Sequence, residues 1–157
     1  MSLLEVLVVI TIFAVLGLLV TQSIILTIQG SKKSESVIRA RENLDYSLST
    51  IERQIRNANS VTPCPNTDTT VINYLDQDGT ASSFSCVNTG SNGSYIASGS
   101  AHLTGDAVKI TACSFNCIPG TEANPSYITI DLTVKEASVS GIQSNVSAST
   151  QIYLRNY

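Results

Sequence analysis

The chain has 157 residues, of which 43% are hydrophobic and 13% charged, and its formal net charge is −3. This length suits one globular domain together with an anchor segment. Residues 32–56 carry six basic and four acidic side chains, whereas residues 57–157 carry three basic and seven acidic ones. The mildly acidic C-terminal domain argues against a nucleic-acid partner, because phosphate binding requires a concentrated basic surface.

The first 31 residues form an apolar run in which Glu5 is the only charged side chain. A helix of about 20 apolar residues is long enough to cross a bilayer, and residues 6–31 carry no charge at all. A carboxylate inside such an apolar segment is energetically unfavourable, so we interpret Glu5 as a residue with a functional role. We expect the charge of Glu5 to be neutralised, and the nearest candidate partner in the sequence is the amino group of Met1.

Two plainer interpretations of this run compete with a functional one. A cleaved secretory signal begins with basic residues, has a shorter apolar core and ends at a small-residue cleavage site. Here no basic residue precedes Lys32, and no Ala-x-Ala pattern follows the run. The other interpretation is an ordinary signal anchor with Glu5 at the membrane interface, but such an anchor has no need of the carboxylate.

Residues 2–20, SLLEVLVVITIFAVLGLLV, resemble the mature N-terminus of a type IV pilin or a type II secretion pseudopilin. In that family a prepilin peptidase removes a short leader, the new first residue is N-methylated, and the fifth residue is Glu. Met1 and Glu5 fall on these two positions, so the resemblance implies an already processed subunit without its leader. One difference is Gln22, because many family members carry proline at that position.

The pattern of residues 2–59 predicts one long helix of about 85 Å. Its first half, residues 1–30, is apolar on all sides and is expected to span the membrane or form a filament core. Its second half, residues 31–60, is amphipathic and has one apolar stripe. We expect that stripe to comprise Val37, Ile38, Leu44, Leu48, Ile51, Ile55 and Ala58.

Gly17 and Gly30 interrupt this helical pattern, and each costs about 1 kcal/mol relative to alanine in a helix interior. One interpretation is close packing, because glycine lets neighbouring membrane helices approach. The resemblance implies a second role as sites of helix flexibility, since pilin helices often lose regular structure around residues 14–23 after assembly. We therefore predict a continuous helix in the monomer and weakened helicity around Gly17 in a filament.

Residues 61–157 show an apolar periodicity of two and are expected to form a β-rich globular head. We predict an α+β fold in which an antiparallel sheet packs on the apolar stripe of the long helix, which is also the pilin architecture. The candidate strands are residues 71–75, 83–87, 107–112, 127–134 and 150–155, with a hairpin turn at residues 76–80.

Four cysteines in a head rich in Ser, Thr, Asn and Gly predict disulfides formed in an oxidising compartment. Three pairings are possible. We favour Cys64–Cys86 and Cys113–Cys117, because the second pair can close a small loop. A zinc site is the competing interpretation, but the chain has no C-x-x-C pair and only one histidine.

Few residues indicate catalytic or ligand chemistry. Asp76-x-Asp78-Gly79 resembles part of a calcium loop, but no bidentate Glu follows at the required place, so we interpret it as a turn. His102 belongs to no recognisable catalytic motif, and neither a phosphate-binding glycine loop nor a Gly-x-Ser-x-Gly elbow occurs. We expect no enzymatic activity, no cofactor and no metal.

The resemblance implies a structural subunit of a type IV pilus that serves adhesion, motility or uptake. Before assembly, the subunit would reside in the cytoplasmic membrane as a single-pass protein. It would then assemble through its N-terminal helix into a helical surface filament. Expected partners are further copies of the chain, the prepilin peptidase and the assembly machinery. In the filament, Glu5 would pair with the N-methylated amine of Met1 on an adjacent subunit. The alternatives are a minor pilin or secretion pseudopilin at a filament tip, or a membrane-anchored surface-binding protein.

Overall fold

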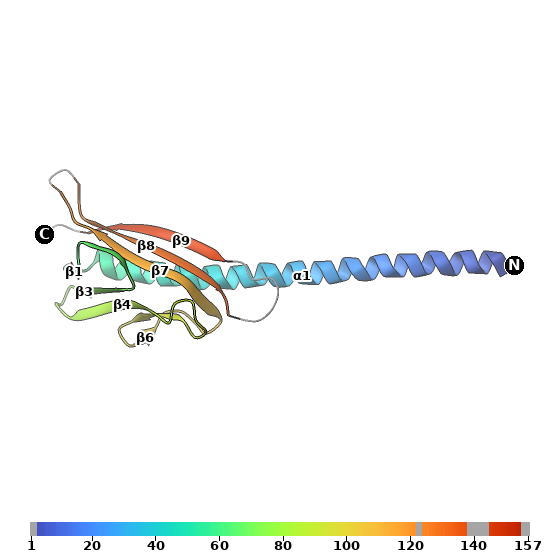
Figure 1. Ribbon diagram of the computed structural model, residues 1–157, viewed down its shortest axis with the longest axis horizontal. Coiled ribbons are helices and arrows are strands. Elements are labelled where there is room, and N and C mark those ends of the chain that lie inside the picture. The colour runs from blue at the N-terminus through green and yellow to red at the C-terminus, as the bar shows by residue number, and fades with distance from the viewer. Residues whose placement is uncertain (1–2, 122–123, 138–144, 155–157) are drawn as a thin grey trace. The chain divides into compact units, whose positions relative to one another are not determined.

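The computed structural model describes residues 3–121, 124–137 and 145–154. These residues form one α-helix and nine β-strands, labelled in Figure 1 where space allows. The chain divides into two compact units, residues 1–35 and residues 36–157. The α+β fold class expected from the sequence is confirmed.

Helix α1 (Leu3–Arg56) is the long N-terminal helix that the sequence predicts. It ends at Arg56 rather than at residue 59, because Asn59 is already bonded to strand β3 and the turn after it. The backbone N–H of Asn59 donates to the Leu75 carbonyl at 2.8 Å, and its side-chain amide donates to the Asp76 carbonyl at 3.0 Å. These bonds hold the chain in an extended conformation immediately after the helix.

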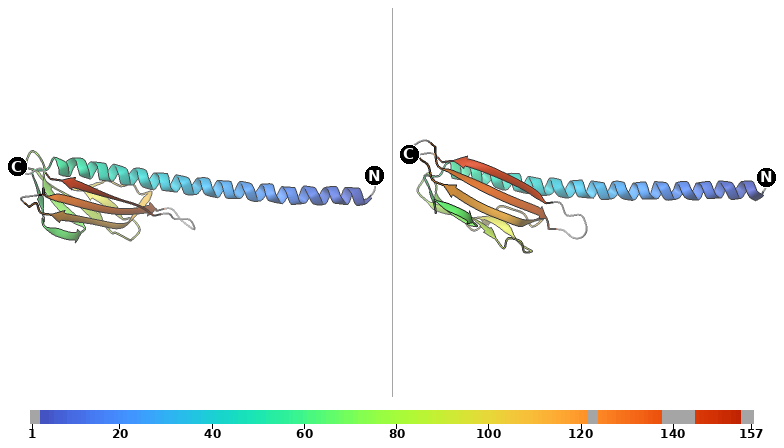
Figure 2. Two further views of the ribbon diagram at one scale, coloured as in Figure 1. Left: turned by 90° about the horizontal axis from the view of Figure 1, so that it is seen from above. Right: turned by 45° about the horizontal axis from the view of Figure 1, so that its top comes forward.

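The C-terminal unit contains two antiparallel sheets where the sequence suggested one (Figure 2). One sheet has the strand order β1-β3-β4-β5-β6 and the other the order β2-β7-β8-β9, and the two meet along β7. The strands are β1 (Ser60–Thr62), β2 (Asn66–Thr69), β3 (Val71–Leu75), β4 (Ala81–Val87), β5 (Tyr95–Ser98), β6 (Ala101–His102), β7 (Val108–Ile118), β8 (Tyr127–Glu136) and β9 (Val146–Tyr153).

The hairpin predicted at residues 76–80 connects β3 to β4. One carboxylate oxygen of Asp76, Oδ1, accepts the backbone N–H groups of Asp78 and Thr80, both at 2.9 Å. Gly79 follows with a φ of +76°, a conformation that suits glycine because it lacks a Cβ. The Asp-x-Asp-Gly sequence therefore acts as a turn, as its residue types predict.

Strand β7 is longer than predicted and lies at the centre of the fold. Its buried side chains alternate with outward polar ones, so that Cys113, Phe115 and Cys117 face the core. This alternation is difficult to recognise in the sequence for two reasons. Two of the inward residues are cysteines, and a register shift between Ile110 and Ala112 breaks the period.

The core of this unit lies between the two sheets and residues 36–56 of α1. Phe84, Ile96 and Phe115 are fully buried and belong to the same cluster as Ile51 and Ile55 of the helix. The predicted apolar stripe is largely confirmed, with one correction: Ile38 is 52% exposed. Successive helical residues are rotated by about 100°, which puts Ile38 on the side opposite Ala40. The small residues Ser36, Ala40 and Ser47 are buried in the stripe.

The disulfides connect Cys64 to Cys117 and Cys86 to Cys113, so the predicted pairs Cys64–Cys86 and Cys113–Cys117 are wrong. Cys113 and Cys117 both lie on β7, and four residues of extended strand span about 13 Å. A disulfide needs Cα atoms within about 7 Å, and the observed pairs have Cα separations of 5.3 and 6.3 Å. The Cys86–Cys113 bond joins β4 of one sheet to β7 of the other.

Candidate functional site

The N-terminal part of α1 exposes a largely apolar surface. From Leu3 to Glu35 every described side chain is exposed, including Leu3 at 84% and Phe13 at 71%. This segment is long and apolar enough to cross a membrane, judged by length and composition. A membrane anchor and a signal sequence share these properties, so length and composition alone do not distinguish between them.

Glu5 lies in the first turn of α1 and is exposed like its apolar neighbours. A carboxylate at this end of a helix interacts favourably with the helix dipole, whose positive end is the N-terminus. Its expected partner, Met1, lies outside the described residues. The placement of Glu5 at the helix start is thus known, whereas its pairing stays a prediction.

Gly17 and Gly30 are both helical, and a Cβ built at either position meets no atom within 4 Å. Packing within the chain therefore gives no reason for either glycine. Near Gly17, the Thr21 hydroxyl donates to the Gly17 carbonyl at 2.8 Å. Back-bonding of this kind slightly destabilises and often bends a helix. Helix α1 is continuous at this point, although both Gly17 and the hydrogen bond from Thr21 lower its local stability.

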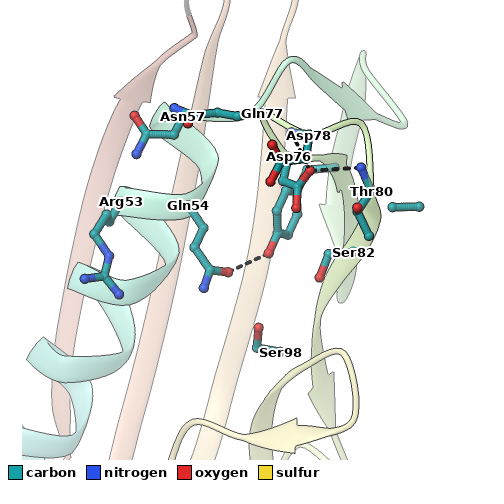
Figure 3. A pocket seen from close by; sticks show the side chains of 11 residues that line it. Arg53, Gln54, Asn57, Asp76, Gln77, Asp78, Thr80, Ser82 and Ser98 are labelled. Atoms are coloured by element: carbon teal, nitrogen blue, oxygen red, sulfur yellow. Dashed lines mark hydrogen bonds between the residues drawn. The ribbon is translucent and has the colours of Figure 1, made fainter.

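A polar cleft of about 490 Å³ lies between the last turns of α1 and the β3–β4 hairpin (Figure 3). Gln54 extends from the helix toward Tyr74, whose hydroxyl donates to Gln54 Oε1 at 2.5 Å. Tyr74 is 5% exposed, and its ring stacks on Phe84 with centroids 5.2 Å apart. The lining is dominated by exposed polar side chains, among them Arg53, Asn57 and Asp78.

This cleft presents no recognisable catalytic arrangement. Of its two acidic residues, Asp76 and Asp78, the first accepts backbone N–H groups of the turn. His102 lies on β6 and stacks on Tyr95 with ring centroids 3.6 Å apart. Among the residues that the structure describes, no three His, Cys, Asp or Glu side chains gather into a group that could hold a metal ion.

Comparison with models of protein families, with curated protein sequences and with solved structures finds no match for this chain.

Proposed function

We propose that this protein is a structural subunit of a type IV filament, anchored in the cytoplasmic membrane before assembly and held in the filament through its N-terminal helix. The observation that carries the proposal is the apolar surface of residues 3–28, which contains one carboxylate, Glu5, and no other charge. The resemblance of residues 2–20 to mature pilin N-termini is the second support.

An apolar surface of this extent requires an apolar surrounding. Leu7, Ile10 and Leu18 are each more than half exposed, and exposed patches of this kind mark membrane or protein contacts. Lipid covers the segment in the membrane form. In the filament, the equivalent helices of neighbouring subunits replace the lipid.

Glu5 distinguishes a filament subunit from a plain anchor. An unpaired carboxylate is unfavourable in an apolar surrounding, and removing one partner of a buried ion pair is strongly destabilising. In the proposed assembly, the methylated amine of Met1 on an adjacent subunit retains its positive charge and pairs with Glu5. The ion pair forms only between subunits in register, so it sets their axial spacing.

The C-terminal unit suits the outside of a surface filament. Its two disulfides are typical of proteins outside the reducing cytoplasm. Its surplus of acidic side chains beyond residue 57 keeps neighbouring heads soluble.

The proposal is tested by electron microscopy of material sheared from cells that produce the protein, with mass analysis of the same sample. The expected result is thin filaments made of this chain, with an N-methylated Met1. Membrane-dispersed protein that never forms a polymer, or a secreted head that lacks residues 1–30, would contradict the proposal.

A further inference from the structure

Three cross-strand neighbours form an apolar row at one end of the sheet β2-β7-β8-β9. Ile118 on β7 pairs with Tyr127 on β8, which in turn pairs with Tyr153 on β9. The three strands lie side by side in Figure 2. Because side chains alternate along a strand and the adjoining Cys117, Ile128 and Ile152 are buried, the row faces away from the core.

The neighbouring positions on this outer face are polar. The next row consists of Asn116, Thr129 and Gln151, and the one after it of Ser114, Asp131 and Ser149. Against this background, Ile118 is 42% and Tyr153 55% exposed. Cross-strand packing accounts for the tilted contact of the two tyrosine rings, whose centroids are 5.9 Å apart. It does not account for leaving these large apolar groups in water.

Backbone hydrogen bonds hold the described residues of the loop beside this row. Thr121 and Asn124 exchange two backbone hydrogen bonds of 2.8 and 3.2 Å, and the N–H of Leu154 donates to the Ser126 carbonyl at 2.9 Å. At Gly120, a Cβ would lie 2.8 Å from the Ser126 nitrogen, so the loop depends on glycine there. The described part of the loop is therefore pre-organised, which lowers the entropic cost of binding a ligand.

The row and the described residues of the loop line an open hollow of about 430 Å³. This volume lies within the range of about 300–1,000 Å³ that is typical of small-molecule sites. Pro119 and Pro125 add apolar walls, while Asn124 and Gln151 add side-chain amides. The Tyr153 hydroxyl donates to Gln151 Oε1 at 3.5 Å, which leaves the two N–H groups of that amide available.

We propose that this hollow binds a pyranose unit of a carbohydrate. A pyranose has an apolar C–H face and a rim of hydroxyls, and the hollow offers aromatic rings beside amides that both donate and accept hydrogen bonds. A purely apolar ligand would leave the amides of Asn124 and Gln151 without partners. Among the described residues that line the hollow, none is basic, so they offer no charge to an anionic ligand. This inference is independent of filament assembly.

The test is saturation-transfer NMR on the full-length protein in a zwitterionic detergent, because glucoside and maltoside detergents carry the proposed ligand. The probes are methyl β-D-glucopyranoside and methyl β-D-galactopyranoside, with sorbitol as an acyclic polyol that has hydroxyls but no flat C–H face. Transfer from the protein to the ring C–H protons of at least one pyranoside, with none to sorbitol, is expected.

Variants locate the binding. Tyr153→Ala removes the exposed ring and is expected to weaken binding by about tenfold, whereas Tyr153→Phe keeps the ring and is expected to retain it. Gln151→Ala removes the amide, including the acceptor of the Tyr153 hydroxyl, but keeps both tyrosine rings, and it is expected to weaken binding. Tyr46→Ala is the matched control, because Tyr46 is 60% exposed on α1, does not line the hollow and is expected to leave binding unchanged. Circular dichroism confirms that each variant is folded.

The inference is overturned if neither pyranoside receives transfer at millimolar concentration, or if sorbitol receives as much. It is also overturned if folded Tyr153→Ala and Gln151→Ala bind as the unaltered chain does, or if Tyr46→Ala loses binding to the same extent. Binding of a proline-rich peptide in place of both sugars would assign the hollow to a protein partner instead.

Discussion

The hydroxyl of Tyr74 donates a hydrogen bond to Oε1 of Gln54 at 2.5 Å and so connects strand β3 to the last turns of α1. Tyr74 is almost completely buried, and a buried hydroxyl without a partner is costly. This bond is therefore a specific link between the helix and the sheet β1-β3-β4-β5-β6.

Removing this link gives the first prediction. Tyr74→Phe keeps the ring stacked on Phe84 but leaves the Gln54 amide without its donor, at a cost of about 1 kcal/mol. The expected fall in the melting temperature is about 3 °C, measured by near-UV circular dichroism in detergent. Tyr46→Phe, at an exposed position, is the control and is expected to melt with the unaltered chain. Equal melting of both variants would contradict the stabilising role.

The packing of α1 against the sheets gives the second prediction. Ile51 is fully buried, so Ile51→Ala is expected to destabilise the C-terminal unit by about 2–5 kcal/mol. Ile38→Ala changes the same residue type on the exposed side of the same helix and is expected to cost no more than about 0.5 kcal/mol. Denaturant unfolding of both variants measures the difference. Similar losses at the two positions would mean that the helix does not pack as described.

The disulfide pairing gives a third prediction with two readouts. The chain has no Lys or Arg between residues 57 and 108 or between residues 110 and 134. Trypsin therefore releases residues 57–109 and 110–135 as two peptides, which stay joined if Cys64 pairs with Cys117 and Cys86 with Cys113. Separate peptides without reduction would contradict the pairing. The pairing Cys64–Cys113 with Cys86–Cys117 would also join these two peptides. Additional cleavage after Phe115 and before Asp76 places each cysteine on its own fragment and so distinguishes that pairing from the observed one.

The same bonds carry much of the stability of the C-terminal unit. The paired cysteines are 53 and 27 residues apart in the sequence, and closing loops of this length contributes about 4 kcal/mol per bond in the chain-entropy model. Replacing Cys86 and Cys113 together by serine is therefore expected to lower the denaturation midpoint strongly. An unchanged midpoint would show that this bond does not restrain the unfolded chain.

Glu5 gives the fourth prediction, which rests on the proposed filament function. Glu5→Ala removes the carboxylate but keeps the apolar segment, so membrane insertion is expected to persist while filaments are lost or become rare. Glu5→Asp keeps the charge and is expected to assemble better than Glu5→Ala. Fractionation of membranes and counting of filaments by electron microscopy separate the two effects. Abundant, normally spaced filaments from Glu5→Ala as the sole subunit would refute the pairing role.

Gly17 gives the fifth prediction, on the filament state. Gly17→Ala is expected to stabilise the helix of the monomer by about 1 kcal/mol, because the added Cβ meets nothing within 4 Å. If the helix loosens around this residue on assembly, the substitution hinders filament formation. A filament map with unbroken helical density from residue 6 to residue 26 would contradict the flexibility of this segment.

The long helix and the α+β class could be predicted from the amino-acid sequence alone. These features follow from local patterns: a run of residues without charge, a helical period from Val37 to Ile55, and strict alternation along β8. The hairpin at Asp76 was predictable for the same reason, because its turn chemistry lies within a few residues.

The cysteine pairing, the division of the strands into two sheets and the hollow at Tyr153 became evident only in the folded chain. Each depends on residues distant in the sequence, and local spacing carries no information on which strands become neighbours. Cys113 and Cys117 are close in the sequence but are held apart because β7 is extended, while Ile118, Tyr127 and Tyr153 meet only through strand pairing. Ile38 illustrates the same limit on a smaller scale, since the helix period permits several stripes and the sheets decide which of them is buried.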